Sequence, residues 1–261
     1  MEPKPKNTFL PSSDVCRTCG SPQIEAYCAQ CGQRTLEHRF NLKDSFQWII
    51  SKIFDLEHGF FHTTWLLLKS PGTVPLDYLK GATVNYTHPF RFMFIWATLS
   101  TLVSHWIGAF EIVGEQFAPM EGSDPEAQRA VQEYMFKYLH LVILATVPFM
   151  TFWNLLFFRK SRMNFTEHLI INAYGLGAST ATGVVFFFMY YLPFAGMWIT
   201  GASMIIMMIV IGRIYSKSYQ QNVYLCMLKY LLIYLLSMVS LMIIAVIVTV
   251  AWKLIEASVA G

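Results

Sequence analysis

Five long apolar segments follow one another after Pro89, and they constrain the fold of this chain more than any other feature. They cover residues 90–110, 138–158, 168–192, 197–214 and 229–254, and very few charged residues lie inside them. A helix needs about 20 apolar residues to cross the hydrocarbon core of a bilayer. The pattern therefore predicts an all-α membrane protein in which residues 89–261 form a bundle of five transmembrane helices.

The composition of the whole chain agrees with a membrane protein. Of its 261 residues, 55% are hydrophobic and only 13% are charged, whereas about 25% of the residues in a soluble domain are charged. Trp and Tyr residues stand near many ends of the apolar segments, as they do at membrane interfaces. Core helices of a large soluble protein are the alternative, and five such segments in one chain argue against it.

Charged residues between the apolar segments predict the orientation in the membrane. The loop after the second segment is basic, and further basic residues surround the loop after the fourth. These residues are Arg159, Lys160, Arg162, Arg213, Lys217 and Lys229. The loop between the first two segments is mostly acidic. Because cytoplasmic loops collect Lys and Arg, we expect a cytoplasmic amino terminus and an external carboxyl terminus. Orientation also accounts for the net charge of +3, and no nucleic-acid binding is expected.

Four cysteines in residues 1–40 predict a small cytoplasmic zinc ribbon. Cys16, Cys19, Cys28 and Cys31 form two Cys-x-x-Cys-Gly motifs, a spacing that places four thiolates around one tetrahedral ion. Disulfides do not persist in the cytoplasm, so we expect one structural Zn²⁺ per chain. A single iron, a redox-active dithiol and an empty site remain alternatives. Four thiolates leave no open coordination position, which argues against catalytic zinc.

Residues 41–88 connect the cysteines to the first apolar segment, and their pattern predicts short amphipathic helices. Apolar residues recur at helical spacing from Phe46 to Phe54, and a second short helix is expected around residues 65–68, before Ser-Pro-Gly. These helices are too short to cross a bilayer. We expect them to lie along the cytoplasmic surface of the membrane.

The order of these features resembles a bacterial family of uncharacterised inner-membrane proteins, a domain of unknown function with a four-cysteine zinc ribbon. The matching residues are Gly59, Phe60, Thr63, Pro71, Gly72, Tyr78, Leu79, Gly81, Tyr86, Pro89, Phe90, Glu167 and His168. The resemblance implies a multi-pass protein of the bacterial inner membrane, and it brings no known reaction. Members often have a second His where this chain has Asn172, which weakens a two-histidine metal site.

Polar and small residues in the third apolar segment are candidates for a site and for helix packing. Glu167, His168 and Asn172 lie at its expected cytoplasmic end, where ionisable groups are costly and often functional. The alternative is that His168 only bonds a neighbouring helix. Gly175, Ser179 and Gly183 recur every four residues, a spacing that allows another helix to approach closely. The expected partner is a helix of the same chain, and a homodimer is the alternative.

The sequence favours a non-enzymatic function without excluding catalysis. It contains no Walker loop, no Gly-x-Gly-x-x-Gly motif after a strand and no Gly-x-Ser-x-Gly motif. We therefore expect a membrane-embedded scaffold or assembly factor, whose ribbon contacts a protein partner or a second copy. The alternative is a transporter or modifier of a small molecule or lipid, with Glu167, His168 and Asn172 as its polar site.

Overall fold

The computed structural model describes residues 15–16, 18–22, 27–33, 59–108, 137–189 and 196–260 of the chain. In these ranges the regular structure is helical, with seven α-helices and the short 3₁₀ helix η1 (Arg159–Ser161). The described residues contain no strand, and an isolated bridge joins Val15 and Pro22. The prediction of an all-α protein is confirmed for this part of the chain.

Two short helices precede the long ones. Helix α2 (Gly59–Lys69) buries Phe60 and Leu67, and α3 (Thr73–Leu79) packs against α8 and α9. Gly72 joins them with a φ of 88°, and a Cβ atom there would come within 2.7 Å of the Lys217 side chain. This contact requires glycine, and it fixes α3 against α9. The amphipathic helix expected before residue 59 lies outside the described residues.

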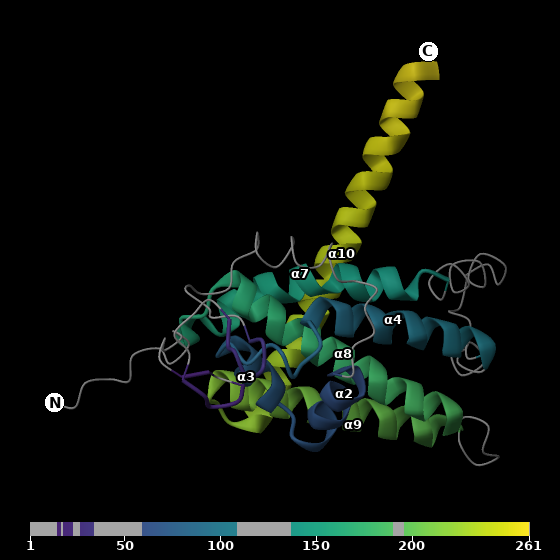
Figure 1. Cartoon of the computed structure of the whole chain (residues 1–261). Coiled ribbons are helices and arrows are strands. Elements are labelled where there is room, and N and C mark those ends of the chain that lie inside the picture. Colours follow the sequence, from purple (N-terminus) through teal and green to yellow (C-terminus); the bar gives the residue numbers. More distant parts are fainter. Residues whose placement is uncertain are drawn as a thin grey trace.

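Four long helices lie side by side and form the body of the molecule (Figure 1). They are α4 (Pro89–Trp106), α7 (Leu139–Phe157), α8 (Phe165–Met189) and α9 (Gly196–Tyr219). Each begins within three residues of an expected apolar segment. Helix α8 is central, because it packs against α4, α7 and α9. The consecutive helices α7, α8 and α9 alternate in direction, so that η1 and the carboxyl end of α9 lie at the same end of the helical body.

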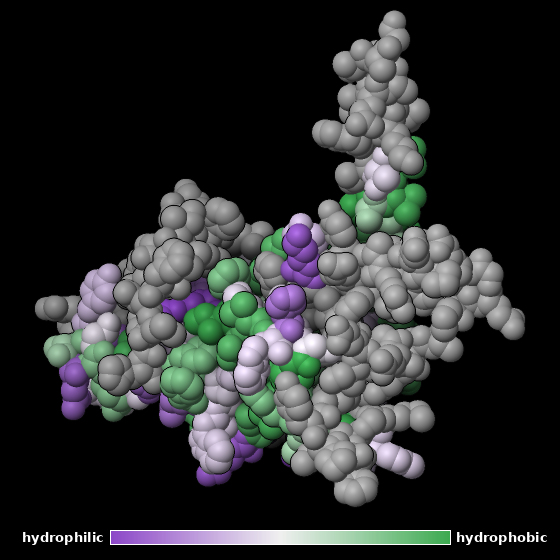
Figure 2. Space-filling view, turned by 90° about the vertical axis from the view of Figure 1, so that its right-hand side faces the viewer, coloured by the Kyte–Doolittle hydropathy of each residue, from purple (hydrophilic) through white to green (hydrophobic). Residues whose placement is uncertain are grey.

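Helix α10 (Val223–Ala260) differs from the other long helices in its direction. It begins six residues before the expected segment, where the Asn222 side chain accepts a hydrogen bond of 2.9 Å from the Tyr224 backbone N–H. Its first part packs against α7 and α9. Figure 1 shows α10 crossing these helices steeply and projecting beyond the body. Figure 2 shows hydrophobic residues on its surface where it leaves the body.

The core lies around the middle of α8, where small residues allow the neighbouring helices to approach. Phe92 of α4 and Tyr174 of α8 are both fully buried, with ring centroids 5.9 Å apart. A Cβ atom at Gly177 would come within 2.5 Å of the Phe92 ring. The absence of a side chain at Gly177 therefore determines how closely α4 packs against α8.

Two helices among the described residues are both long enough and apolar enough to cross a bilayer, namely α8 and residues 223–251 of α10. Residues 141–157 of α7 are apolar but form a shorter stretch. Helix α4 contains Arg91 and several Ser and Thr residues, and α9 contains Arg213 and Lys217. Helices form at all five expected segments, but only these two are both long enough and apolar enough to cross a bilayer among the described residues. The five-span bundle therefore stays a prediction.

Candidate functional site

The four cysteines predicted as metal ligands meet in space. The Sγ atoms of Cys16, Cys19, Cys28 and Cys31 all lie within 4.8 Å of one another. Two of these distances are 3.5 Å, between Cys16 and Cys31, and 3.6 Å, between Cys19 and Cys28. Four sulfurs at about 2.3 Å from a tetrahedral zinc would lie about 3.8 Å apart. The cluster therefore has the donor set and the dimensions of a metal site.

Both Cys-x-x-Cys-Gly motifs fold into the same turn. The Gly20 N–H donates to the Cys16 carbonyl at 2.9 Å, and the Gly32 N–H donates to the Cys28 carbonyl at 2.8 Å. Gly20 and Gly32 have φ angles of 75° and 72°, in the left-handed region that other residues rarely adopt. The glycines that the sequence places after each pair are thus required by the turns, and the two turns present their sulfurs to a common centre.

Ser21 is a polar neighbour of the cluster that the sequence analysis did not identify. Its hydroxyl lies 2.9 Å from Cys19 Sγ and 3.1 Å from Cys28 Sγ. The hydrogen bond from Ser21 is the largest cause that lowers the pKa of both thiols, and together with backbone hydrogen bonds from Cys31 and Gln30 it brings the pKa of Cys28 to about 6. Metals bind the thiolate form, so this contact prepares two of the four ligands for a cation.

Gln33 attaches the cysteine cluster to the helical body, and its side chain is only 2% exposed. Its Oε1 atom accepts hydrogen bonds from the backbone N–H groups of Thr83 and Val84 at 3.0 and 3.1 Å, and from the Thr18 hydroxyl at 2.9 Å. Its Nε2 group donates to the Thr83 hydroxyl at 3.0 Å. The described part of the ribbon is therefore docked onto the connection between α3 and α4. No pattern in the sequence indicates contacts across 50 residues.

Glu167 has a structural task at the beginning of α8. The Asn164 N–H donates to the Glu167 carboxylate at 2.9 Å, and the Glu167 N–H donates to the Asn164 side chain at 2.8 Å. This reciprocal pair is a capping box, and the Asn-x-x-Glu spacing before an apolar run could have predicted it. Glu167 is 2% exposed. Capping the helix accounts for a buried carboxylate at this position.

His168 and Asn172 are both buried but contact different partners. His168 Nδ1 lies 2.8 Å from the Tyr219 hydroxyl of α9. Asn172 accepts 2.6 Å hydrogen bonds from Asn154 and from the Tyr215 hydroxyl, and it donates to the Thr151 hydroxyl at 2.9 Å. These bonds join α7, α8 and α9 across the core. His168 thus bonds a neighbouring helix, and a functional role for His168 or Asn172 stays a prediction.

Two members of the expected packing ridge on α8 make no close approach. A Cβ atom at Gly175 or at Gly183 would meet no atom within 4 Å. The Ser179 hydroxyl donates to the Leu176 carbonyl of its own helix at 3.0 Å. The tightest glycine contact of α8 lies instead at Gly177, on Phe92. A role for the Gly175, Ser179 and Gly183 ridge in packing stays a prediction.

Arg91 is a buried cation that the sequence analysis did not identify. It lies in the first turn of α4 and is 5% exposed. Within the part of the chain described here, its Nε and Nη1 groups have no hydrogen-bond acceptor. Removing a charge from water without a partner costs several kcal/mol. An anion that enters beside Arg91 would offset this cost.

The sequence matches one family model. Residues 57–101 match the family described as Protein of unknown function (DUF3667). The matched segment contains α2, α3 and most of α4, together with the two backbone groups that Gln33 binds. It supports the prediction of an uncharacterised family and leaves the source organism and the membrane location untested. Searches of curated proteins and of solved structures gave no match.

Proposed function

We propose that this chain is a multi-pass protein of the bacterial inner membrane in which a zinc ribbon serves as a rigid docking module for a protein partner. The observation that carries the proposal is the Gln33 contact, which holds the four-cysteine cluster against the α3–α4 connection. A module fixed in this way presents one surface in one orientation. Zinc would stabilise a segment too short to form its own apolar core.

Two further observations favour a scaffold over an enzyme. All four thiol groups converge on one centre, so that a bound zinc would have no open position for a substrate. The polar residues in the core of the body, His168 and Asn172, are engaged with neighbouring helices. A different protein is the partner that best suits a ribbon docked on the surface of a packed helical body. A second copy of the chain is the alternative partner.

A comparison of three purified proteins tests the proposal. Wild type, Cys19→Ser and the control Cys226→Ala are extracted in native lipid and analysed for metal content and for copurifying proteins. We expect about one zinc per chain and a reproducible partner in wild type and in the control, and loss of both in Cys19→Ser. Membrane insertion should be unchanged in all three. A wild type without zinc, or a partner that survives Cys19→Ser, would contradict the proposal.

Site-directed labelling tests the orientation. A cysteine introduced at Ser123 is expected to react with an impermeant reagent from outside intact cells, whereas one at Ser161 should react only after permeabilisation. Ser161 ends η1, which contains Arg159 and Lys160, and this basic turn is the reason for its expected cytoplasmic location. Protection of both positions in intact cells would argue against the odd number of spans.

Arg91 favours a second candidate function, the transport or modification of a small acidic molecule or lipid. Its buried Nε and Nη1 groups have no hydrogen-bond acceptor within the described structure, and an anionic ligand would supply one. Arg91→Lys keeps the charge and loses the planar array of donors, whereas Arg91→Met removes both. If the body acts on an acidic ligand, both variants should lose the cellular phenotype while remaining folded. A gain in thermal stability with an unchanged phenotype would assign Arg91 to the scaffold alone.

A further inference from the structure

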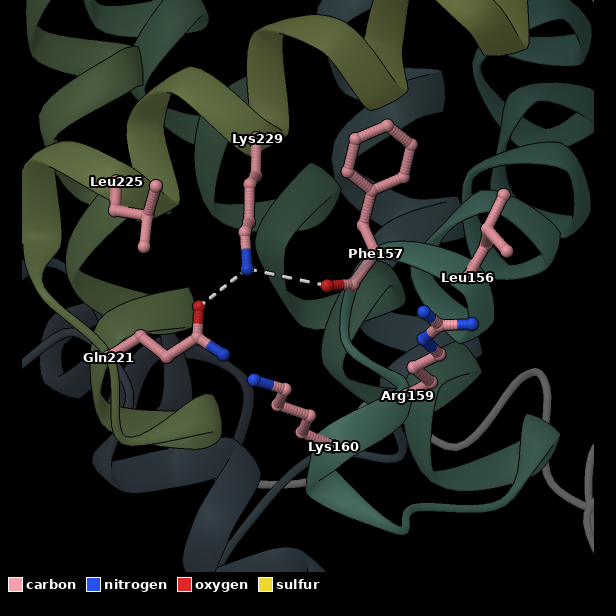
Figure 3. Close-up of a pocket in the computed structure, with 7 residues that line it drawn as sticks. All are labelled: Leu156, Phe157, Arg159, Lys160, Gln221, Leu225 and Lys229. Carbon is pink, nitrogen blue, oxygen red and sulfur yellow. Dashed lines mark hydrogen bonds between the residues drawn. The ribbon is translucent and has the colours of Figure 1, made fainter.

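A basic pocket lies between the carboxyl end of α7 and the beginning of α10, separate from the cysteines and from the polar core. Its volume is about 520 Å³, and its lining residues are Leu156, Phe157, Arg159, Lys160, Gln221, Leu225 and Lys229. In Figure 3 the amine ends of Lys160 and Lys229 point toward the same opening beside Gln221, and Arg159 stands at the rim. Of the described residues, three cations and no carboxylate line this space.

Lys229 is held in place while one of its donors remains available. Its Nζ atom donates to the Gln221 side-chain oxygen at 2.7 Å and to the Phe157 carbonyl at 3.3 Å. An ammonium group has three N–H donors, so one is left for a ligand. The same Nζ atom lies 4.6 Å from the centre of the Phe158 ring, a cation–π contact that also fixes its position.

Among the residues that the structure describes, none neutralises the positive charge of the pocket. None of Arg159, Lys160 and Lys229 forms an ion pair with any residue in the described ranges, and Arg159 and Lys160 are exposed. Three like charges around one opening repel one another. The Gln221 amide adds a neutral donor beside them. This combination of donors and charge matches the oxygens of a phosphate group, which accept several hydrogen bonds at once.

Apolar residues flank the charged opening on the outer surface of the body. Leu156 is 54% exposed and Leu225 is 45% exposed. Both belong to helices that continue away from the pocket as apolar stretches. A ligand that fits both features has a phosphate group and hydrocarbon chains beside it. Basic pockets between helices at the cytoplasmic side of a membrane bind lipid headgroups in this way.

We propose that this pocket binds the phosphate group of an anionic phospholipid, with the acyl chains lying along Leu156 and Leu225. Lys160 and Lys229 contact the phosphate oxygens, and Gln221 donates a further hydrogen bond. The lipid as the source of the phosphate depends on the proposed membrane location of α7 and α10. Recognition of phosphate itself does not depend on it, so the two can fail separately.

Native mass spectrometry of the full chain tests the proposal. The detergent-purified protein is titrated with phosphatidylglycerol and, separately, with phosphatidylcholine, and inorganic phosphate and glycerol 3-phosphate serve as soluble competitors. The variants are Lys229→Gln, Lys160→Gln and the double variant. The matched control is Lys69→Gln with Lys80→Gln, which removes two exposed lysines outside the pocket. Lys160 is exposed on η1, so its replacement leaves the core intact.

We expect selective retention of phosphatidylglycerol by wild type and by the control. Each pocket lysine removed should weaken binding about fivefold, and the double variant about 30-fold, since a lysine near an anionic lipid contributes about 1 kcal/mol. Binding should also weaken as salt is added. Retention of soluble phosphate alone would overturn the lipid source and keep the phosphate site. Equal retention of both lipids, or no difference between the pocket variants and the control, would overturn the proposal.

Discussion

Helices α8 and α10 are the two described helices that are long and apolar enough to cross a membrane, yet their surroundings are opposite. In α8, 83% of the most apolar stretch is buried inside the protein, whereas in α10 only 12% is buried. The first is surrounded by α4, α7 and α9, and the second projects beyond them (Figure 1). The apolar surface of α8 is therefore covered by protein, whereas the described residues leave most of the apolar surface of α10 uncovered.

The comparison shows which helix carries the evidence for a membrane. A buried apolar helix such as α8 would also suit the core of a soluble protein, so its hydropathy says little about lipid. Helix α10 exposes a succession of large aliphatic residues, including Leu235, Ile243 and Val246. Exposed apolar surface of this extent is rare on soluble monomers. The membrane assignment therefore depends mainly on α10.

A lysine on the exposed face of α10 is expected to have the largest effect. Ile243 is 53% exposed, so Ile243→Lys creates no clash within the body. If α10 lies in lipid, the charge should disfavour insertion by about 2.5–3.5 kcal/mol. Protease accessibility of the carboxyl terminus in membrane vesicles measures this, with Ile243→Leu as the control. Unchanged insertion of Ile243→Lys would place this face of α10 outside the hydrocarbon core.

A smaller effect is expected for a methyl group at the tightest contact of α8. Gly177→Ala puts a Cβ atom within 2.5 Å of the Phe92 ring, and overpacking of this kind costs about 1–3 kcal/mol. Gly183→Ala is the matched control, because a Cβ atom there meets nothing within 4 Å. Thermal unfolding in detergent compares the two variants. Equal stability of both would show that α4 and α8 separate easily.

The smallest change in stability is expected from removing side-chain hydrogen bonds in α8 and α10. Asn172→Ala on α8 removes the acceptor and donor that join three helices, and we expect a loss of about 0.5–2 kcal/mol. Thr249→Ala on α10 should change stability little, because the Thr249 hydroxyl donates to the Ala245 carbonyl of its own helix and joins no second helix among the described residues. If thermal unfolding shows a stable Asn172→Ala variant with a lost phenotype, Asn172 belongs to a functional site.

Hydropathy predicted the positions of the helices because a long run of apolar residues marks a buried helix in either environment, protein or lipid. Expected and observed segments agree most closely for α7, at 138–158 and 139–157. The cysteine cluster was equally predictable, since two short motifs define its turns. Hydropathy could not tell which surroundings each helix has, and this is why α8 and α10 looked alike.

Contacts between distant residues were beyond the sequence. Gln33 binds the backbone of residues 83 and 84 and the Thr83 hydroxyl, and no local pattern in either segment indicates that the two meet. The bonds of Asn172 depend on the rotation of α7 and α9 about their axes. Arg159, Lys160 and Lys229 were understood only as signs of orientation, because their convergence on one pocket requires the position of α10.

The two halves of the basic pocket are made at different times during synthesis. Phe157 and Lys229 lie 72 residues apart, which corresponds to roughly 4–14 s of translation at 5–20 residues per second. During that interval the end of α7 and the turn with Arg159 and Lys160 exist without their partner helix. The pocket is completed only when α10 docks, so its occupancy by lipid would report that α10 has packed against α7.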